Sequence, residues 1–177
     1  MNLGAIIARF SGGFDMVLKM EKSIKQKAEA LFDDGDLDVL YELLAPYLEQ
    51  GDPDAEFLYS SFSLESKNET EEEFEERSMR LLISASEGGV AEASYRLGVI
   101  YLYGDFVDTN SKSSSEYFER AIAQGHSHSK FTYGFSLYYG SSGVSQDKAR
   151  GLQFLEEAAK EGVGLATEEL KLIHARE

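Results

Sequence analysis

The chain has 177 residues, of which 42% are hydrophobic and 28% are charged, and it contains no cysteine. This length and apolar content suit one folded domain rather than a disordered chain, and the absence of thiols excludes disulfides, thiolate metal sites and cysteine nucleophiles. The formal net charge of −15 gives a field that repels nucleic acid phosphates, so we expect no direct binding to DNA or RNA.

Residues 1–20 form an N-terminal segment without a clear helical pattern. A secretory signal has basic residues before its apolar run, and this segment has none there, so we do not expect a secretory signal. A helix that crosses a bilayer needs about 20 consecutive apolar residues, and no stretch of the chain approaches this length. We therefore expect a cytoplasmic protein that makes no membrane contact. Met1, Met16 and Met20 are alternative translation starts.

From residue 21 to residue 177 we expect a single helical-repeat domain. Glu21–Asp33 and Asp36–Gly51 have the pattern of a degenerate first helix pair, with Gly35 at the turn between them. This pair is the first repeat, residues 21–51.

The second repeat, residues 52–89, carries signals for the start of both of its helices. Asp52 followed by Pro53 is typical of an N-cap with proline in the first helical position. Thr70 has Glu73 three residues later, which is the spacing of a capping box, and further glutamates follow Thr70 where the helix dipole favours negative charge.

Nearly all of the net charge lies in residues 33–76, which contain 16 acidic residues and Lys67 as the single basic one. The rest of the chain is close to electrically balanced. Solubility alone is one explanation of such a segment, and attraction of a basic surface is the other.

Two further repeats, residues 90–125 and 126–162, precede a single terminal helix within residues 163–175. In the third repeat, Ser113 and Glu116 again have capping-box spacing and predict the start of its second helix at Ser113. Alternation with a period of two residues never persists along the chain, so no β-strand is expected.

The repeats align on four glycines, 38, 36 and 37 residues apart: Gly51, Gly89, Gly125 and Gly162. Each glycine suits the left-handed conformation that ends a helix. Four residues after each glycine the side chain is small: Ala55, Ala93, Ser129 and Ala166. Eight residues after it the side chain is large and apolar: Tyr59, Leu97, Tyr133 and Leu170. The ninth position is small in three copies, Ser60, Gly98 and Gly134, which predicts close approach of a neighbouring helix.

The third repeat carries the pattern Ala93, Leu97-Gly98, Tyr101, Gly104, Val107, Tyr117-Phe118 and Ala121, and the fourth carries Gly140, Gly143, Val144, Phe154, Leu155 and Ala158. This pattern resembles the Sel-one-like repeat of the tetratricopeptide family, most clearly over residues 89–177. Phe106 departs from it, because the family has glycine there. The resemblance implies an all-α fold, a right-handed α-solenoid of antiparallel helix pairs with about four repeats.

No group of residues satisfies the requirements of an active site, so no enzyme, cofactor or catalytic residue is expected. His126 and His128 are two residues apart at a helix start and would point to different faces, and His174 lies far along the chain, so no metal site is predicted. Gly140 and Gly143 lack the lysine of a phosphate-binding loop.

The tetratricopeptide layout implies that certain first-helix positions line the inner wall of the solenoid, where partners bind. Here these positions carry mainly aromatic residues: Phe57, Tyr95, Val99, Leu102, Tyr103, Phe131, Phe135, Tyr138 and Tyr139, with Glu92 and His128 at the edges. The acidic helix start adds Glu71, Glu72, Glu73, Glu75 and Glu76 as partner-binding candidates. Ordinary packing between repeats is the competing interpretation of the aromatic residues.

The resemblance implies a non-enzymatic protein-protein interaction module, and the acidic segment predicts a basic partner. Small acidic solenoids of this kind resemble bacterial immunity proteins, so neutralisation of a basic toxin such as a nuclease is the more specific hypothesis. A scaffold or adaptor in signalling or cell-envelope assembly, which binds a peptide or helix in the groove, is the alternative. The identity of the partner and the oligomeric state stay open.

Overall fold

The computed structural model describes residues 18–176, and within this range it contains nine α-helices, one 3-10 helix and no strand. The α-helices are α1 (Lys22–Asp34), α2 (Leu37–Leu48), α3 (Pro53–Tyr59), α4 (Glu71–Glu87), α5 (Ala91–Tyr103), α6 (Ser111–Ala123), α7 (Ser127–Tyr139), α8 (Lys148–Lys160) and α9 (Gly164–His174). The all-α prediction is confirmed. Of the N-terminal segment, residues 1–17 lie outside the described range, and with them two of the alternative starts, Met1 and Met16.

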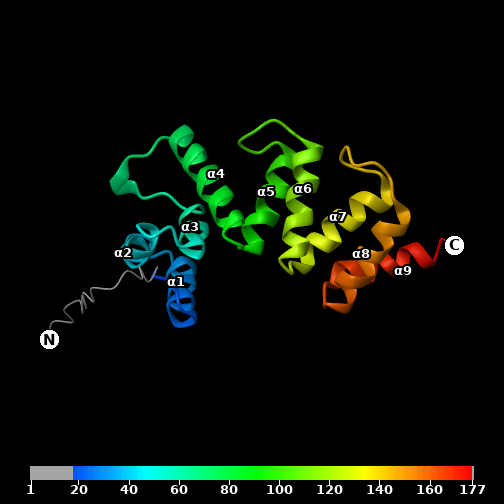
Figure 1. The fold of residues 1–177 in the computed structure, drawn as a ribbon, viewed down its shortest axis with the longest axis horizontal. Helices are drawn as coiled ribbons and strands as arrows, with labels where there is room; N and C mark the ends of the chain where they lie inside the picture. The colour runs from blue at the N-terminus through cyan, green and yellow to red at the C-terminus, as the bar shows by residue number, and fades with distance from the viewer. Residues whose placement is uncertain (1–17, 177) are drawn as a thin grey trace, which may run out of the picture.

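The helices follow one another along the long axis of the molecule, from α1 and α2 at one end to α9 at the other (Figure 1). Each helix packs mainly against its neighbours in the chain. The links inside the second, third and fourth repeats, between α3 and α4, α5 and α6, and α7 and α8, lie along one edge in Figure 1, whereas the turns between repeats lie along the other. This arrangement is a solenoid of stacked helix pairs, as predicted.

The four aligned glycines end the second helix of each pair in the same way. Their φ angles are 67°, 95°, 91° and 92°, in the left-handed region that favours glycine. After α8, for example, the Gly162 N–H donates to the Ala159 carbonyl at 3.1 Å and the Val163 N–H donates to the Ala158 carbonyl at 2.9 Å. The same pair of hydrogen bonds closes α2, α4 and α6. These are Schellman caps, so the prediction of left-handed caps is confirmed.

Glycines inside helices set the distance between the members of a pair. A Cβ atom added to Gly98 of α5 would lie 2.7 Å from the buried ring of Phe118 on α6. On α7, a Cβ atom at Gly134 would lie 3.1 Å from the carbonyl oxygen of Gly151 on α8. The small ninth positions therefore permit the close helix approach that the sequence predicts.

Two of the three predicted helix starts are confirmed. The Asp52 carboxylate accepts hydrogen bonds from the N–H groups of Asp54 and Ala55, both at 3.0 Å, and Thr70 forms a full capping box with Glu73. The Asp52 carboxylate also accepts the N–H of Met20 at 2.9 Å.

The predicted start at Ser113 is wrong. Asn110 caps α6 instead, because its side-chain oxygen accepts the N–H of Ser113 at 3.0 Å while its own backbone is extended. Ser113 therefore lies in the first turn of α6, and the helix begins two residues earlier. The following residue, Ser114, is fully buried and donates to the carbonyl of Gly98 at 2.9 Å, which joins α6 to α5.

The core is a row of four clusters, each formed between consecutive helices rather than at one common centre. Its largest fully buried apolar side chains are Phe118, Leu40, Leu44, Leu97 and Leu155. A row of this kind leaves the faces of the solenoid available for partners.

The α3–α4 link, residues 60–70, is held in place by Arg77 of α4. Its guanidinium donates to both carboxylate oxygens of Glu69, at 2.6 and 2.7 Å, and to the backbone carbonyls of Tyr59 and Phe62 at 2.7 and 2.9 Å. It also lies 4.0 Å from the ring centroid of Tyr59. These hydrogen bonds hold the pKa of the Glu69 carboxyl below its usual value.

Candidate protein-binding surface

Helices α5 and α7 carry large side chains at equivalent positions 36 residues apart: Tyr95 and Phe131, Val99 and Phe135, Tyr103 and Tyr139. Along each helix these positions are four residues apart and therefore share one face. We call these six residues the aromatic column. Tyr103 is 69% exposed and Phe135 is 36% exposed. The position equivalent to Phe135 on α9 is Leu172, which is 51% exposed.

The part of the aromatic column on α7 is a continuous run of rings. The ring centroids of Phe131 and Phe135 are 6.3 Å apart, and those of Phe135 and Tyr139 are 4.8 Å apart. Tyr138 extends the run with a centroid distance of 4.9 Å to Tyr139. The Tyr139 hydroxyl donates to Glu169 of α9 at 2.6 Å, and this hydrogen bond raises the pKa of Tyr139. Tyr139 therefore also joins the fourth repeat to α9.

Other predicted site residues are half-buried between repeats. Phe57 packs against the cluster of α4 and α5, and Phe131 packs against the cluster of α8 and α9. Tyr95, Val99 and Leu102 pack against the cluster that includes Phe118 and Tyr133. These residues line the surface and connect neighbouring repeats at the same time.

Glu92 and His126 form a polar junction at the edge of the aromatic column. The backbone N–H of Ser129 donates to His126 Nδ1 at 3.1 Å. In the neutral ring the proton is therefore on Nε2, which lies 2.8 Å from the Glu92 carboxylate. This hydrogen bond holds the pKa of Glu92 below its usual value. His128 is exposed, and no group of three metal-ligating side chains occurs within residues 18–176.

The structure also brings together residues that the sequence reasoning missed. Arg96 donates to the Ser61 hydroxyl at 2.6 Å and lies 4.6 Å from the ring centroid of Phe57. Phe74 of α4 and Phe106, which follows α5, line the same pocket as Arg96. The repeat pattern singles out Phe106 as a departure from the family glycine, but it gives no sign that this side chain lines a pocket.

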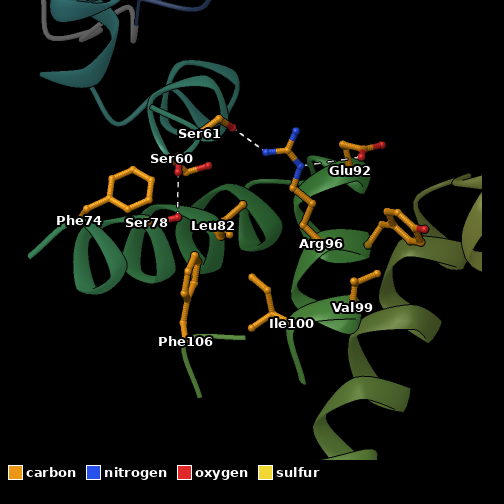
Figure 2. Close-up of a pocket in the computed structure, with 11 residues that line it drawn as sticks. Ser60, Ser61, Phe74, Ser78, Leu82, Glu92, Arg96, Val99, Ile100 and Phe106 are labelled. Carbon is orange, nitrogen blue, oxygen red and sulfur yellow. Dashed lines mark hydrogen bonds and ion pairs between the residues drawn. The ribbon is translucent and has the colours of Figure 1, made fainter. Parts of the chain in front are cut away.

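These residues surround a pocket of about 410 Å³ between the end of α3, α4 and α5 (Figure 2). Its lining consists of Ser60, Ser61, Phe74, Ser78, Leu82, Glu92, Tyr95, Arg96, Val99, Ile100 and Phe106. We call it the α4–α5 pocket. Three predicted residues, Glu92, Tyr95 and Val99, lie in its wall.

The predicted acidic residues lie in the first two turns of α4. Glu71, Glu72 and Glu76 are exposed, and Glu75 is half-buried. Glu73 turns back to accept the Thr70 N–H at 2.9 Å and completes the capping box, so it also has a structural role. Glu72, Glu75 and Glu76 line a second hollow of about 350 Å³ together with Met79, Phe106 and Val107.

No helix within the described part of the chain is long and apolar enough to cross a membrane.

Comparison with known proteins identifies the repeats. The Sel1 repeat model matches residues 91–126 and 129–163. The fold is similar to that of a Sel1 repeat protein from Oxalobacter formigenes, with 27% sequence identity and a TM-score of 0.64, over 72% of this chain and 94% of that one. No curated protein sequence matches the chain.

A second similar structure is a protective antigen present in uropathogenic Escherichia coli strains, which displays an SLR fold. Its sequence identity is 18% and its TM-score is 0.71, over 87% of this chain and 33% of the antigen, so the chain spans about one third of that protein. The two matched repeats coincide with the pairs α5–α6 and α7–α8. The chain therefore contains two Sel1 repeats, residues 91–126 and 129–163, within a solenoid whose fold is similar to that of Sel1 repeat proteins.

Proposed function

We propose that this chain is a non-enzymatic protein-binding module whose partner presents a basic surface. Sel1-like solenoids generally serve as protein-protein interaction modules, because stacked repeats present one long surface. The observation that carries the proposal is the aromatic column, which presents the exposed residues Tyr103 and Phe135 on the first helices of successive repeats. Exposed aromatic side chains of this kind favour protein interfaces, because they offer large contact area at low entropic cost.

The charge of the partner follows from the acidic start of α4. Glu71, Glu72 and Glu76 are exposed, and none of them forms an ion pair with another residue of the described range. Free carboxylates accelerate association with a positively charged partner, and the aromatic contacts then slow dissociation.

Affinity capture from the native host, followed by binding measurements with the purified partner, tests this function. The test variant combines Tyr103→Ser with Phe135→Ser. Leu165→Ser is the matched control, because Leu165 is 63% exposed and lies outside the column. The partner is expected to have a basic surface and to bind the test variant at least about tenfold more weakly than the control. Neutral or acidic partners, or equal binding by both variants, would refute the proposal.

Neutralisation of a basic toxin is the more specific form of this function. In that case the captured partner is toxic alone, and adding the purified chain suppresses its activity. The association rate should fall steeply with salt, since exposed charges are screened beyond about 8 Å at physiological ionic strength. Reversing the charge at Glu71, Glu72 and Glu76 should lower this rate strongly.

A scaffold or adaptor role is the second candidate, favoured by the α4–α5 pocket, whose volume of about 410 Å³ suits an apolar side chain of a bound peptide or helix. The same charge reversal separates the two roles. Binding that stays nearly unchanged, with a rate insensitive to salt, supports the adaptor role and argues against charge-steered toxin neutralisation.

A further inference from the structure

Phe106 has a backbone conformation that favours glycine. Its φ angle is 64°, in the left-handed region, where a bulky side chain is strained. The residue is nevertheless 44% exposed, so burial in the core does not explain why a phenylalanine stands here. Strain of this kind persists where the surrounding structure holds the residue in place, and it occurs often at functional positions.

The ring of Phe106 lies between two hollows. It forms a wall of the α4–α5 pocket and of the acidic hollow that Glu72, Glu75 and Glu76 line. Figure 2 shows it pointing between α4 and α5, close to Leu82 and Ile100. One side chain therefore contributes to both spaces.

The α4–α5 pocket offers an apolar interior. Leu82 and Ile100, which are 3% and 8% exposed, lie beside the rings of Phe74 and Phe106. The polar groups already have partners inside the protein: Ser60 donates to the Phe57 carbonyl at 2.6 Å. Ser78 donates to the Ser60 carbonyl at 2.8 Å, and Ser61 accepts from Arg96 at 2.6 Å (Figure 2). An apolar side chain fits this chemistry better than a polar ligand, and the volume is in the range of about 300–1,000 Å³ typical of binding pockets.

The acidic hollow, in contrast to the apolar α4–α5 pocket, suits a positively charged side chain. Glu72, Glu75 and Glu76 form no ion pair with another residue in 18–176. The aliphatic stem of a lysine or arginine could pack on Met79 and Val107 while its charge meets these carboxylates.

We propose that the two hollows form one docking site for a partner segment that carries a large apolar residue close to a lysine or arginine, with Phe106 between the two side chains. The apolar residue enters the α4–α5 pocket and the basic residue lies against the carboxylates at the start of α4. The carboxylates of the acidic hollow favour a positively charged residue, so the expected occupant is a protein segment with both a basic and an apolar side chain. This inference rests on the proposed protein-binding function.

Selection of random 12-residue peptides displayed on phage against the purified full-length chain tests this site. The enriched peptides are expected to share a bulky apolar residue within a few positions of lysine or arginine. Two variants then test the mode of binding. Phe106→Gly removes the ring and suits the φ angle, so its melting temperature should not fall while affinity for the selected peptides drops about tenfold. Replacing three carboxylates by amides, at Glu72, Glu75 and Glu76, should weaken binding and abolish its salt dependence.

Matched controls separate this site from the aromatic column. The same glutamate-to-glutamine change at exposed positions on other helices should leave binding unchanged: Glu116, Glu156 and Glu168. Selected peptides without basic residues, or an unchanged affinity in Phe106→Gly, would overturn the inference. So would a failure to enrich any peptide, or a dimer in solution that Phe106→Gly converts to a monomer, because a second copy would then occupy the site. If only the variant that combines Tyr103→Ser with Phe135→Ser loses the peptides, this docking site is wrong but the proposed function still stands. The capture experiment from the native host tests that function independently.

Discussion

Gly151 of α8 lies where the fourth repeat is most tightly packed. A Cβ atom added there would be 2.5 Å from the Tyr138 nitrogen, 2.7 Å from the Gly134 oxygen and 2.8 Å from the Tyr138 Cα. Ordinary contacts of a Cβ atom lie at 3.4–4 Å. All three of these neighbours are backbone atoms of α7, so no side-chain rotation relieves the overlap. Gly151→Ala therefore requires α7 and α8 to move apart by about 1 Å.

The expected loss of stability follows from two opposing effects. Overpacking of this kind costs about 1–3 kcal/mol, and the displaced helices also loosen the buried side chains of Tyr133 and Leu155. Alanine, in contrast, favours a helix interior by about 1 kcal/mol relative to glycine. Because all three close neighbours are backbone atoms, the overpacking cost lies at its upper end of about 3 kcal/mol. The net destabilisation is then about 2 kcal/mol, which corresponds to a fall in melting temperature of about 4–8 °C for a chain of this size.

Urea unfolding followed by circular dichroism measures this difference. Gly164→Ala is the matched control, because Gly164 is the first residue of α9 and an added Cβ atom there meets nothing within 4 Å. The control should equal the wild type or exceed it slightly. If Gly151→Ala is as stable as the control, the close packing of α7 on α8 is wrong.

Three further predictions concern the polar groups that join the helices. Arg77→Met should lower the free energy of unfolding in urea by about 3 kcal/mol, because it leaves Glu69 and two backbone carbonyls without a partner. Arg77→Lys should recover less than half of this loss, since one ammonium group cannot donate to all these acceptors. The lowered pKa of Glu69 means that this pair stabilises the fold above the unfolded value of 4.5 and that the stabilisation disappears as the pH falls through the folded pKa. The stability difference between wild type and Glu69→Gln should therefore vanish in acid, and a difference that stays constant to pH 3 would contradict this origin. Gln124→Ala should cost about 1–2 kcal/mol, because Gln124 accepts from Ser94 at 2.6 Å and donates to the Ser86 carbonyl at 2.9 Å, and unchanged unfolding would show that this link between repeats contributes nothing.

The repeat frame was predictable because it depends on local chemistry. The glycine spacing predicts the caps that the Schellman hydrogen bonds then confirm, and the small residue at Gly98 predicts the close approach of Phe118. A capping signal is less secure where two candidates lie close together. Ser113 has the right spacing to Glu116, yet Asn110 caps α6 and the helix begins earlier, because asparagine and serine are about equally good N-caps and spacing alone does not choose between them.

The candidate site was only partly predictable. Positions on the first helices follow from the repeat, so Tyr103 and Phe135 could be named from the sequence as surface residues. The α4–α5 pocket depends on how the link after α5 folds back onto α4 and α5, and the repeat pattern specifies residue types in that link but not this contact. Arg96, Phe74 and Phe106 come from three different elements, and only their arrangement in space makes them neighbours.

The identical glycine turns between repeats make the length of this molecule adjustable. The turn at Gly125 has the same hydrogen bonds as the turns at Gly89 and Gly162, so the chain enters and leaves the third repeat with the same geometry. A duplicate of residues 90–125 inserted after Gly125 should stack in register and add one more row of aromatic side chains. The extent of the binding surface, and with it the size of segment that it holds, would then grow in steps of one repeat without any redesign of the existing rows.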